Sequence, residues 1–310
     1  MAVVEDRFRV MASEARVLLV DPTPEAPTLV RRRLAELEQR WSRFLPDSEI
    51  SRINLAGPHE AVDISTDTSM LIEFMQQAHG FTDGRFDPTL LREIVEAGYA
   101  TSIDDPDRRS MFTDCSAGGA TVAEIELDHV AKTATLPVGL VLDPGGLGKG
   151  AAADVVVAEL MAEGTAGAMV GIGGDLAVSG VPPGDDGWIV AVEHPLRPDE
   201  ELGHLALDHG GIATSSTLTR RWTSGGRARH HLVDPATGTC STTDLAAVTV
   251  VAGASWQAEV HATAAILATS SGVLGHLDRF GLSGVAVTHT GEVLATSDLR
   301  AWATKIGDRT

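Results

Sequence analysis

The chain has 310 residues, of which 43% are hydrophobic, and this is enough apolar material for a sizeable core, so a disordered chain is excluded. The 43 acidic residues outnumber the 24 basic ones, and the formal net charge of -19 argues against binding to nucleic acid or to anionic membranes. Two cysteines are too few for a zinc cluster or a disulfide framework. No apolar segment reaches the roughly 18–20 residues of a membrane span, and no secretory signal is visible, so we expect a cytoplasmic protein.

The first part of the chain is predicted to be mostly helical. Apolar residues recur near every 3.6 positions between Pro24 and Trp41, which is typical of an amphipathic helix. In chain order we predict a strand at Arg16–Asp21, helices at Pro24–Trp41, Pro46–Asn54 and Ser69–Ala78, a turn at Thr82–Thr89 and a polar surface loop at 104–121.

Strands dominate the prediction from residue 123 onward. Short apolar or alternating segments bounded by Gly, Pro and Asp favour strands, whereas longer apolar segments favour helices. In chain order we predict strands at Ala123–Leu127 and Ala134–Leu136, a strand, a Gly-rich turn and a helix over Val138–Gly164, a strand pair over Ala166–Gly180, strands at Trp188–Val192, His204–Asp208, Gly211–Ser215, His230–Val233 and Leu245–Val251, a helix at Ala258–Thr269, and a hairpin formed by Val285–Thr288 and Val293–Thr296. These elements follow no regular βαβ order, so we predict the α+β class.

The most informative motif is DPGGLGKGAAAD, at Asp143–Asp154. Its glycines let a ligand approach the backbone, and the N–H groups at a helix start form a site for anions. Lys149, one of three lysines in the chain, adds a positive charge that suits a phosphate. The spacing matches neither the P-loop nor the Rossmann fingerprint. The alternative interpretation is a tight strand-to-helix turn with a solvated lysine.

Two other segments could either bind a phosphate or form an ordinary turn or loop, and the sequence favours neither interpretation. GIGGDLAVSG, at Gly171–Gly180, places glycines between two predicted strands, which suits either a ligand contact or a hairpin turn. TSSTLTRRW, at Thr214–Trp222, offers hydroxyls and two arginines for a phosphate or a sugar, or else forms a polar loop.

Two segments near the C-terminus carry residues suited to acid–base and metal chemistry. In HHLVDPATG, at His230–Gly238, a histidine is a candidate general base near neutral pH, and the alternative is a hydrogen-bonded histidine beside a turn. On a strand, His231 and Val233 would share one face. In AEVHATAAILA, Glu259 and Thr263 lie one helical turn apart and, with a backbone carbonyl, would make an all-oxygen Mg²⁺ site. The alternative there is a carboxylate that caps a helix.

Taken in order, these segments resemble the motifs of the ApbE family, the FAD:protein FMN transferases, from about Met11 to Ala268. FLPDSEISRIN, TDGRFDPT and LDPGGLGKGAAAD are similar to three successive family motifs. IGGDLAVSG, ATSS, HHLVDPATG and AEVHATA resemble four more in the same order. Seven motifs in one order with compatible spacing are highly specific.

The resemblance implies an α+β, T-fold-related single domain over 1–310, with mixed antiparallel sheets and flanking helices. It implies two lobes, a helix-rich lobe over about 1–120 and a strand-rich lobe with the Gly-rich loops over about 121–310. It also implies an enzyme that binds FAD with Mg²⁺ and transfers FMN to a Ser or Thr hydroxyl of an acceptor flavoprotein, with release of AMP.

The same resemblance implies the site residues. FAD contacts are implied at Met11, Phe44, Arg85, Phe86, Asp87, Asp143, Lys149 and Leu232. Metal ligands are implied at the Gly146 carbonyl, Glu259 and Thr263. His231 matches the histidine that we expect to take the proton of the acceptor hydroxyl.

Three positions depart from the family motifs. Glu259 stands where the family has Asp, Met11-Ala12-Ser13 replaces Met-Gly-Thr, and Ser216 replaces the glycine of Thr-Ser-Gly. The longer side chain of Glu259 moves its carboxylate by about 1 Å, and Mg²⁺ demands near-ideal octahedral geometry. Two alternatives to a transferase therefore stay open: a non-catalytic FAD-binding protein, and a Mg²⁺-dependent FAD pyrophosphatase that gives FMN and AMP.

Overall fold

The computed structural model describes residues 1–113 and 119–299, so residues 114–118 of the predicted surface loop lie outside the described part. The chain divides into two compact units, and each unit is assembled from segments that are distant in sequence. The first unit contains residues 1–32, 149–220 and, of the described residues, 242–299. The second unit contains residues 33–148 and 221–241.

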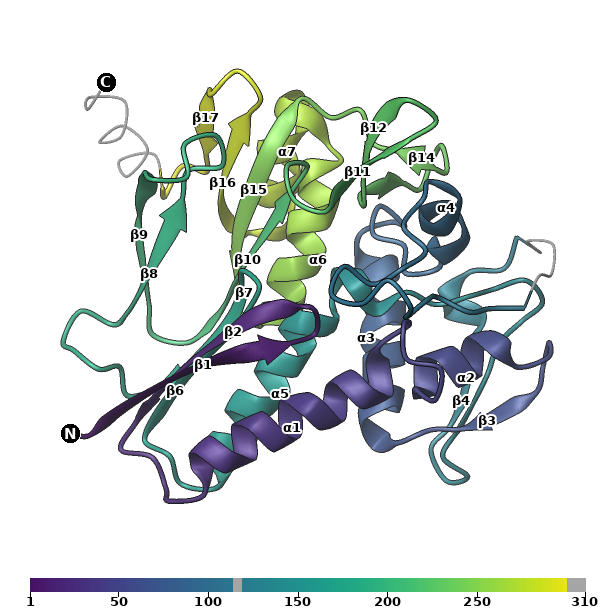
Figure 1. Cartoon of the computed structure of the whole chain (residues 1–310). Helices are drawn as coiled ribbons and strands as arrows, with labels where there is room; N and C mark the ends of the chain where they lie inside the picture. The colour runs from purple at the N-terminus through teal and green to yellow at the C-terminus, as the bar shows by residue number, and fades with distance from the viewer. Residues whose placement is uncertain (114–118, 300–310) are drawn as a thin grey trace. The chain divides into compact units, whose positions relative to one another are not determined.

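Within the described residues, the first unit is built on an eight-stranded sheet in the order β1-β2-β6-β7-β10-β15-β16-β17, with every neighbouring pair antiparallel (Figure 1). Its strands are β1 (Val3–Val10), β2 (Ser13–Val20), β6 (Gly167–Ile172), β7 (Asp175–Gly180), β10 (Gly210–Ser216), β15 (Leu245–Ala252), β16 (Ser283–Thr288) and β17 (Val293–Ala295). β15 is apolar along most of its length and is buried from Leu245 to Val250, as expected for a strand that is covered on both faces.

The two faces of this sheet are covered by different elements. Helix α6 (Ser255–Ile266) packs against β7, β10 and β15, and α7 (Thr269–Phe280) packs against β16. On β10, Gly211 contacts Ser255 of α6, whereas the next residue, Ile212, belongs to an apolar cluster. Because side chains alternate along a strand, α6 and the apolar cluster lie on opposite faces of the sheet.

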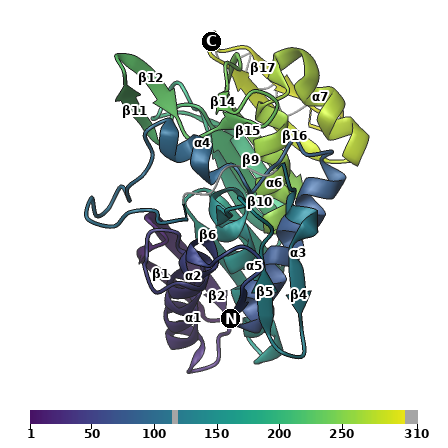
Figure 2. The ribbon, with the colours of Figure 1, turned by 90° about the vertical axis from the view of Figure 1, so that its right-hand side faces the viewer.

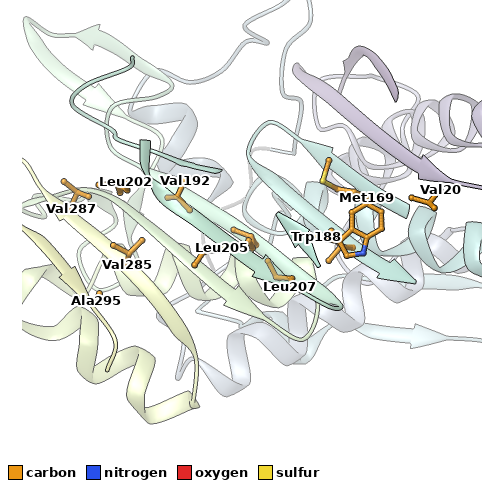
Figure 3. Packing of buried hydrophobic residues seen from close by; sticks show 12 residues of the cluster. Val20, Met169, Trp188, Val192, Leu202, Leu205, Leu207, Val285, Val287 and Ala295 are labelled. Carbon is orange, nitrogen blue, oxygen red and sulfur yellow. The ribbon is translucent and has the colours of Figure 1, made fainter. Parts of the chain in front are cut away.

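The apolar cluster joins the sheet to a two-stranded ribbon of β8 (Trp188–Glu193) and β9 (Glu201–Leu207) (Figure 3). Trp188 is only 1% exposed, whereas its neighbour Ile189 is 50% exposed. This alternation is the pattern of a strand with one face buried and one face in solvent. The ribbon and the sheet contribute Val20, Met169, Val178, Trp188, Val192, Leu202, Leu205, Leu207, Ile212, Val285, Val287 and Ala295.

The second unit combines helices with short antiparallel strands (Figure 2). Helix α1 (Ala26–Trp41) ends in this unit, and α5 (Gly148–Ala162) begins at its boundary. Two of its helices start where a serine side chain accepts a backbone N–H: Ser51 N donates to Ser48 Oγ at 3.0 Å, and Thr68 N donates to Ser65 Oγ at 3.3 Å. These two helices are α2 (Glu49–Leu55) and α3 (Thr66–Phe81). The unit also contains α4 (Leu91–Glu96), a sheet of β3 (Ala61–Asp63), β5 (Thr133–Thr135) and β4 (Glu126–Asp128), and two hairpins, β11 (Arg221–Ser224) with β12 (Arg227–His230) and β13 (Val233–Asp234) with β14 (Thr239–Cys240).

The predicted α+β class with antiparallel sheets and flanking helices is confirmed. In residues 1–113 and 119–299, no helix combines the length and apolar character that a membrane crossing needs. The sequence prediction missed β1, β3, α4, β11, β14 and α7, and its helix at Ala258–Thr269 joined α6 to the start of α7.

The strand predicted immediately before the Gly-rich turn is wrong. No strand is assigned between Val138 and Leu142. The side chain of Asn54 takes the place of a strand neighbour, because Leu142 N donates to Asn54 Oδ1 at 2.7 Å and Asn54 Nδ2 donates to Leu142 O at 2.9 Å. Likewise, the predicted strand at Ala123–Leu127 begins as a 3₁₀ turn, Val122–Glu124, before β4.

The continuous strand predicted at His230–Val233 is also wrong. His230 pairs with Arg221 in one hairpin, and Val233 pairs with Cys240 in the next. His231 and Leu232 lie between the two hairpins, where the chain bends. His231 and Val233 are therefore not neighbours on one strand face.

Replacing Trp188 by Ala is expected to lower the free energy of unfolding by about 3–5 kcal/mol, because a large side chain is removed from a closed apolar cluster. The matched control is Ile189→Ala on the solvent side of the same strand, which is expected to cost less than about 1 kcal/mol. Urea unfolding of the three proteins measures both changes. Equal losses for the two variants would contradict the assignment of the buried face.

Candidate functional site

Helix α6 starts in close contact with two glycine backbones. A Cβ atom at Gly150 would lie 2.7 Å from the backbone of Ser255, and one at Gly211 would lie 2.3 Å from Ser255 Cα. Neither position has room for a larger residue. The glycines therefore let the first turn of α5 and strand β10 approach the first residue of α6 directly.

Asp154 of α5 fixes the start of α6 by hydrogen bonds. Its two carboxylate oxygens accept the backbone N–H groups of Ser255 and Trp256, each at 2.9 Å. A carboxylate at this end of a helix also interacts favourably with the helix dipole. Burial raises the pKa of Asp154 to about 6, although the two backbone hydrogen bonds act to lower it.

The side chains of Lys149, Asp175 and Glu259 form a charged cluster in the first unit, in which both carboxylates are buried and the lysine is partly buried. Lys149 Nζ pairs with Asp175 Oδ2 and, at 2.9 Å, with Glu259 Oε1. Asp175 is 2% exposed and Glu259 is 4% exposed. Gly150 N donates to Glu259 Oε2 at 2.8 Å, so the glutamate binds both the charge and the backbone of the first turn of α5.

The pKa values in this cluster are shifted by burial and by the neighbouring charges. Burial and the nearby charge of Asp175 raise the pKa of Glu259 to about 7, against the opposing effects of Lys149 and the Gly150 N–H. Burial alone would lower the pKa of Lys149, but the two carboxylates raise it above its usual value. The lysine therefore keeps its positive charge inside the protein.

Two turns of the backbone lie beside this cluster. Met11 and Ala12 have φ values of 52° and 53° in the tight turn between β1 and β2. A Cβ atom at Gly173 would lie 2.6 Å from Ser13 Oγ and 3.8 Å from the Lys149 side chain. Gly173 also donates its N–H to Glu14 O at 2.9 Å. The first β-hairpin, the glycine turn between β6 and β7, and Lys149 therefore gather in one region of the first unit.

The donor set around Glu259 suits a hard cation. Thr263 follows one turn later on α6, and its hydroxyl lies 3.0 Å from Ser215 Oγ of β10. Carboxylate, hydroxyl and backbone carbonyl oxygens are the ligands that Mg²⁺ prefers. No group of three or more His, Cys, Asp or Glu side chains in the described residues is arranged as a metal site. A cation at Glu259 would therefore need hydroxyl, carbonyl, water or phosphate oxygens to complete its shell.

In the second unit, the predicted residues Gly146, Phe86 and Asp143 lie around the Gly-rich turn. A Cβ atom at Gly146 would lie 2.7 Å from the Phe86 ring, so only glycine fits against this buried phenylalanine. Asp143 accepts the N–H of Gly145 at 2.9 Å and pairs with Arg43 Nε at 3.3 Å. This carboxylate therefore holds the turn in shape.

The remaining predicted residues of the second unit occupy turns. Asp87 Oδ1 accepts the backbone N–H of Thr89 at 2.8 Å and its hydroxyl at 2.7 Å. Arg85 is exposed after a turn in which Asp83 and Gly84 have positive φ values of 52° and 72°. Leu232 is buried, and its carbonyl accepts the N–H of Ser241 at 2.9 Å.

Each unit holds part of the predicted site. Met11, Lys149, Glu259 and Thr263 belong to the first unit, and Phe44, Arg85, Phe86, Asp87, Asp143, Gly146, His231 and Leu232 belong to the second. The structure joins Lys149 to Glu259 directly and packs Gly146 on Phe86. Sequence reasoning missed Asp154, Asp175 and Arg43 as site residues. Asp154 ends the motif at Asp143–Asp154 and Asp175 lies inside the motif at Gly171–Gly180, so their place in these two motifs was the available signal.

The pH dependence of stability tests the burial of Asp154. Its pKa is about 6 in the folded chain against 3.8 for the ordinary side chain, so the unfolded chain loses the proton first. The free energy of unfolding therefore falls as the pH rises from about 4 to about 6, by up to about 3 kcal/mol from this group. Asp154→Asn removes the titration, so urea unfolding of both proteins should show the wild type losing stability relative to the variant across this window. A constant difference between pH 4 and 7 would contradict the assignment.

The chain matches the model of the ApbE family over residues 11–306. A Chlamydia trachomatis protein named FAD:protein FMN transferase is 30% identical over 242 residues, covering 75% of this chain and 71% of that protein. A Vibrio cholerae protein of the same name is 26% identical over 227 residues, covering 72% and 67% of the two chains.

Two solved structures share the fold. The ApbE protein of Thermotoga maritima has a TM-score of 0.83 at 22% identity, covering 97% of this chain and 99% of its own. The apo flavinyl transferase ApbE of Pseudomonas stutzeri has a TM-score of 0.81 at 23% identity, covering 97% of each chain. Because the family model spans nearly the whole sequence, this chain belongs to the ApbE family.

Proposed function

We propose that this protein is a cytoplasmic, Mg²⁺-dependent FAD:protein FMN transferase that attaches FMN to a Ser or Thr hydroxyl of an acceptor flavoprotein and releases AMP. The proposal rests on membership of the ApbE family and on relatives that carry this name. The observation that supports it most directly is the contact of Lys149 with the buried Glu259, beside the glycine turn between β6 and β7.

The cluster of Lys149 with Asp175 and Glu259 contains one ammonium group and two carboxylates, so a divalent cation would be needed beside it to compensate a substrate with concentrated negative charge. FAD contains a pyrophosphate, and a protein with a net charge of -19 must compensate this group locally. Lys149 supplies a positive charge that is already paired with these two carboxylates, and the backbone N–H groups of the glycine turns supply uncharged donors. Bound Mg²⁺ would be held by Glu259, Thr263 and the Gly146 carbonyl, and it would supply positive charge that stabilises a reacting phosphate.

The remaining proposed contacts come from Met11, Phe44, Arg85, Phe86, Asp87, Asp143 and Leu232. Phe44 is half-buried and offers aromatic surface for the flavin or adenine ring, whereas Phe86 is buried and would act by supporting Gly146. Arg85 is exposed and positively charged, so it can pair with a phosphate or with the acceptor. Asp87 and Asp143 shape turns rather than adding free charge, because their carboxylates already accept backbone N–H groups.

His231 is the proposed base. Its imidazole takes the proton from the acceptor hydroxyl, and the hydroxyl oxygen then forms a bond to the phosphorus of the FMN half of FAD. The bond between that phosphorus and the bridging oxygen breaks, and AMP leaves with the electron pair. The products are a phosphoester of the acceptor and AMP, so no oxidant or reductant is needed.

Incubation of the protein with FAD, Mg²⁺ and a candidate acceptor domain separates this function from its alternatives. Covalent flavin on the acceptor, with one AMP released per flavin, supports the transferase. FMN and AMP free in solution would instead identify a pyrophosphatase, and bound but unchanged FAD would identify a non-catalytic FAD-binding protein.

His231→Ala is expected to lower the transfer rate by about 100-fold or more while the KM for FAD stays within about threefold, because the variant loses a base rather than a binding contact. The matched control is His209→Ala, since His209 is exposed in the turn between β9 and β10. Stopped-time assays that detect the flavinylated acceptor by its fluorescence in a gel give the transfer rate and the KM for FAD. An equal loss of rate and FAD affinity in His231→Ala would make His231 a binding residue instead of the base.

A further inference from the structure

Arg43 is a buried arginine of the second unit that no motif singled out. It lies two residues after the end of α1 and is 5% exposed. A guanidinium group is costly to bury unless its N–H groups and its charge find partners. The contacts of Arg43 therefore indicate its structural role.

Its polar partners hold two segments in place. Arg43 Nε pairs with Asp143 Oδ1 at 3.3 Å, at the start of the Gly-rich turn. Nη1 and Nη2 lie 3.4 Å and 3.3 Å from Tyr99 O, and Nη1 also donates to Ser110 Oγ. The guanidinium group thus links Asp143 to the chain that follows α4.

Arg43 also contacts two aromatic rings. The guanidinium carbon lies 4.2 Å from the centre of the Phe44 ring and 4.9 Å from the centre of the Tyr99 ring. The Phe44 and Tyr99 rings also meet edge to face at 5.8 Å. Arg43 therefore contacts Phe44 and Asp143, two of the proposed FAD residues, and fixes Tyr99 beside them.

Tyr99 in turn anchors the β11–β12 hairpin. The ring of Trp222 on β11 stacks on Tyr99 with centres 5.4 Å apart, and Trp222 Nε1 donates to Ala97 O at 2.6 Å. Gly98 has a φ of 112°, and a Cβ atom there would lie 2.7 Å from Trp222 Nε1. Only glycine at this position lets the tryptophan seat so closely.

The hairpin leads directly to His231. Trp222 pairs with Arg229 and Arg221 pairs with His230, the last residue of β12. His230 Nε2 lies 3.1 Å from Ser241 O, which fixes the end of the hairpin. The next residue is His231.

We propose that Arg43, Tyr99 and Trp222 form a positioning stack that holds His231 in register with Asp143 and Phe44. The inference rests on the proposed function, because it assumes that His231 is the base and that the other two residues contact FAD. Arg43 and Trp222 are positioning residues, since they act through other residues. Such a stack would fix the base relative to the flavin half of the substrate, and misplacement by about 1 Å can cost about 100-fold in rate.

The first test is amide hydrogen exchange of the full-length chain, without substrate. Arg43→Met and Trp222→Leu should each speed exchange in residues 221–231 by about tenfold, because both remove contacts that hold the hairpin closed. The matched control is Arg108→Met, which removes the half-exposed ion pair of Arg108 with Asp105 and should leave the hairpin unchanged. Unchanged exchange at 221–231 in both stack variants would overturn the inference.

The second test is the kinetics of FMN transfer. Trp222→Leu should lower kcat by about tenfold and leave the KM for FAD within about twofold, whereas Arg43→Met should also raise that KM, because it releases Asp143 and Phe44. Trp222→Phe keeps a ring on Tyr99 and should recover most of the kcat. An unaltered kcat in Trp222→Leu, or no recovery in Trp222→Phe, would contradict a positioning role.

The two tests distinguish a failure of the proposed function from a failure of the positioning stack. If the wild type transfers no FMN, the proposed function is wrong, and hydrogen exchange alone decides whether the stack orders the hairpin. If the wild type transfers FMN and the hairpin exchange does not respond, the positioning stack is wrong while the proposed function stands. If Arg43→Met does not fold, Trp222→Leu and Trp222→Phe carry both tests.

Discussion

The buried contact of Lys149 with Asp175 and Glu259 is the constraint on which the first unit depends. An isolated charge costs several kcal/mol inside a protein, so these groups can be buried only together. Their side chains come from α5, β7 and α6. A shift of any of these elements would leave a buried charge without its partner, and the cluster therefore fixes how the two helices meet the sheet.

The contacts around the cluster follow from the need to keep these charged groups paired. Glu259 reaches Lys149 only if α6 starts close to α5, and Gly150 permits that approach because it carries no side chain. Asp154 secures the same helix start through two backbone N–H groups. In the second unit, Arg43 meets a similar demand, because it is buried only together with Asp143 and two aromatic rings. Each unit thus organises its share of the proposed site around a paired basic side chain, Lys149 in the first unit and Arg43 in the second.

Local sequence patterns predicted much of the fold, because hydrophobic periodicity and capping residues act over a few positions. The helices predicted at Pro46–Asn54 and Ser69–Ala78, which correspond to α2 and α3, and the glycine turn before Asp175 are examples. The strand predicted before Leu142 failed because a single distant side chain, Asn54, satisfies that backbone. Nothing in the local pattern reports a contact between residues so far apart in the chain.

In the candidate site, too, local motifs could be predicted from the sequence, whereas contacts between distant residues could not. Motif order predicted Lys149 and Glu259, but it did not predict that they would pair with each other, since they lie on separate motifs. Asp175 completes the cluster from a third motif and was overlooked for the same reason. The partners of Arg43 are equally distant in sequence, so burial and contact geometry were needed to identify it.

The most direct test of the account is the coupling between Mg²⁺ and FAD binding at Glu259. Flavin fluorescence titrations with and without Mg²⁺ give the Kd for FAD in the wild type, in Glu259→Gln and in Glu163→Gln, a control with an exposed glutamate. We expect Mg²⁺ to tighten FAD binding by about tenfold or more in the wild type and the control, and to have no effect in Glu259→Gln. The same Mg²⁺ effect in Glu259→Gln would contradict the assignment of the buried cluster to the phosphate end of the site.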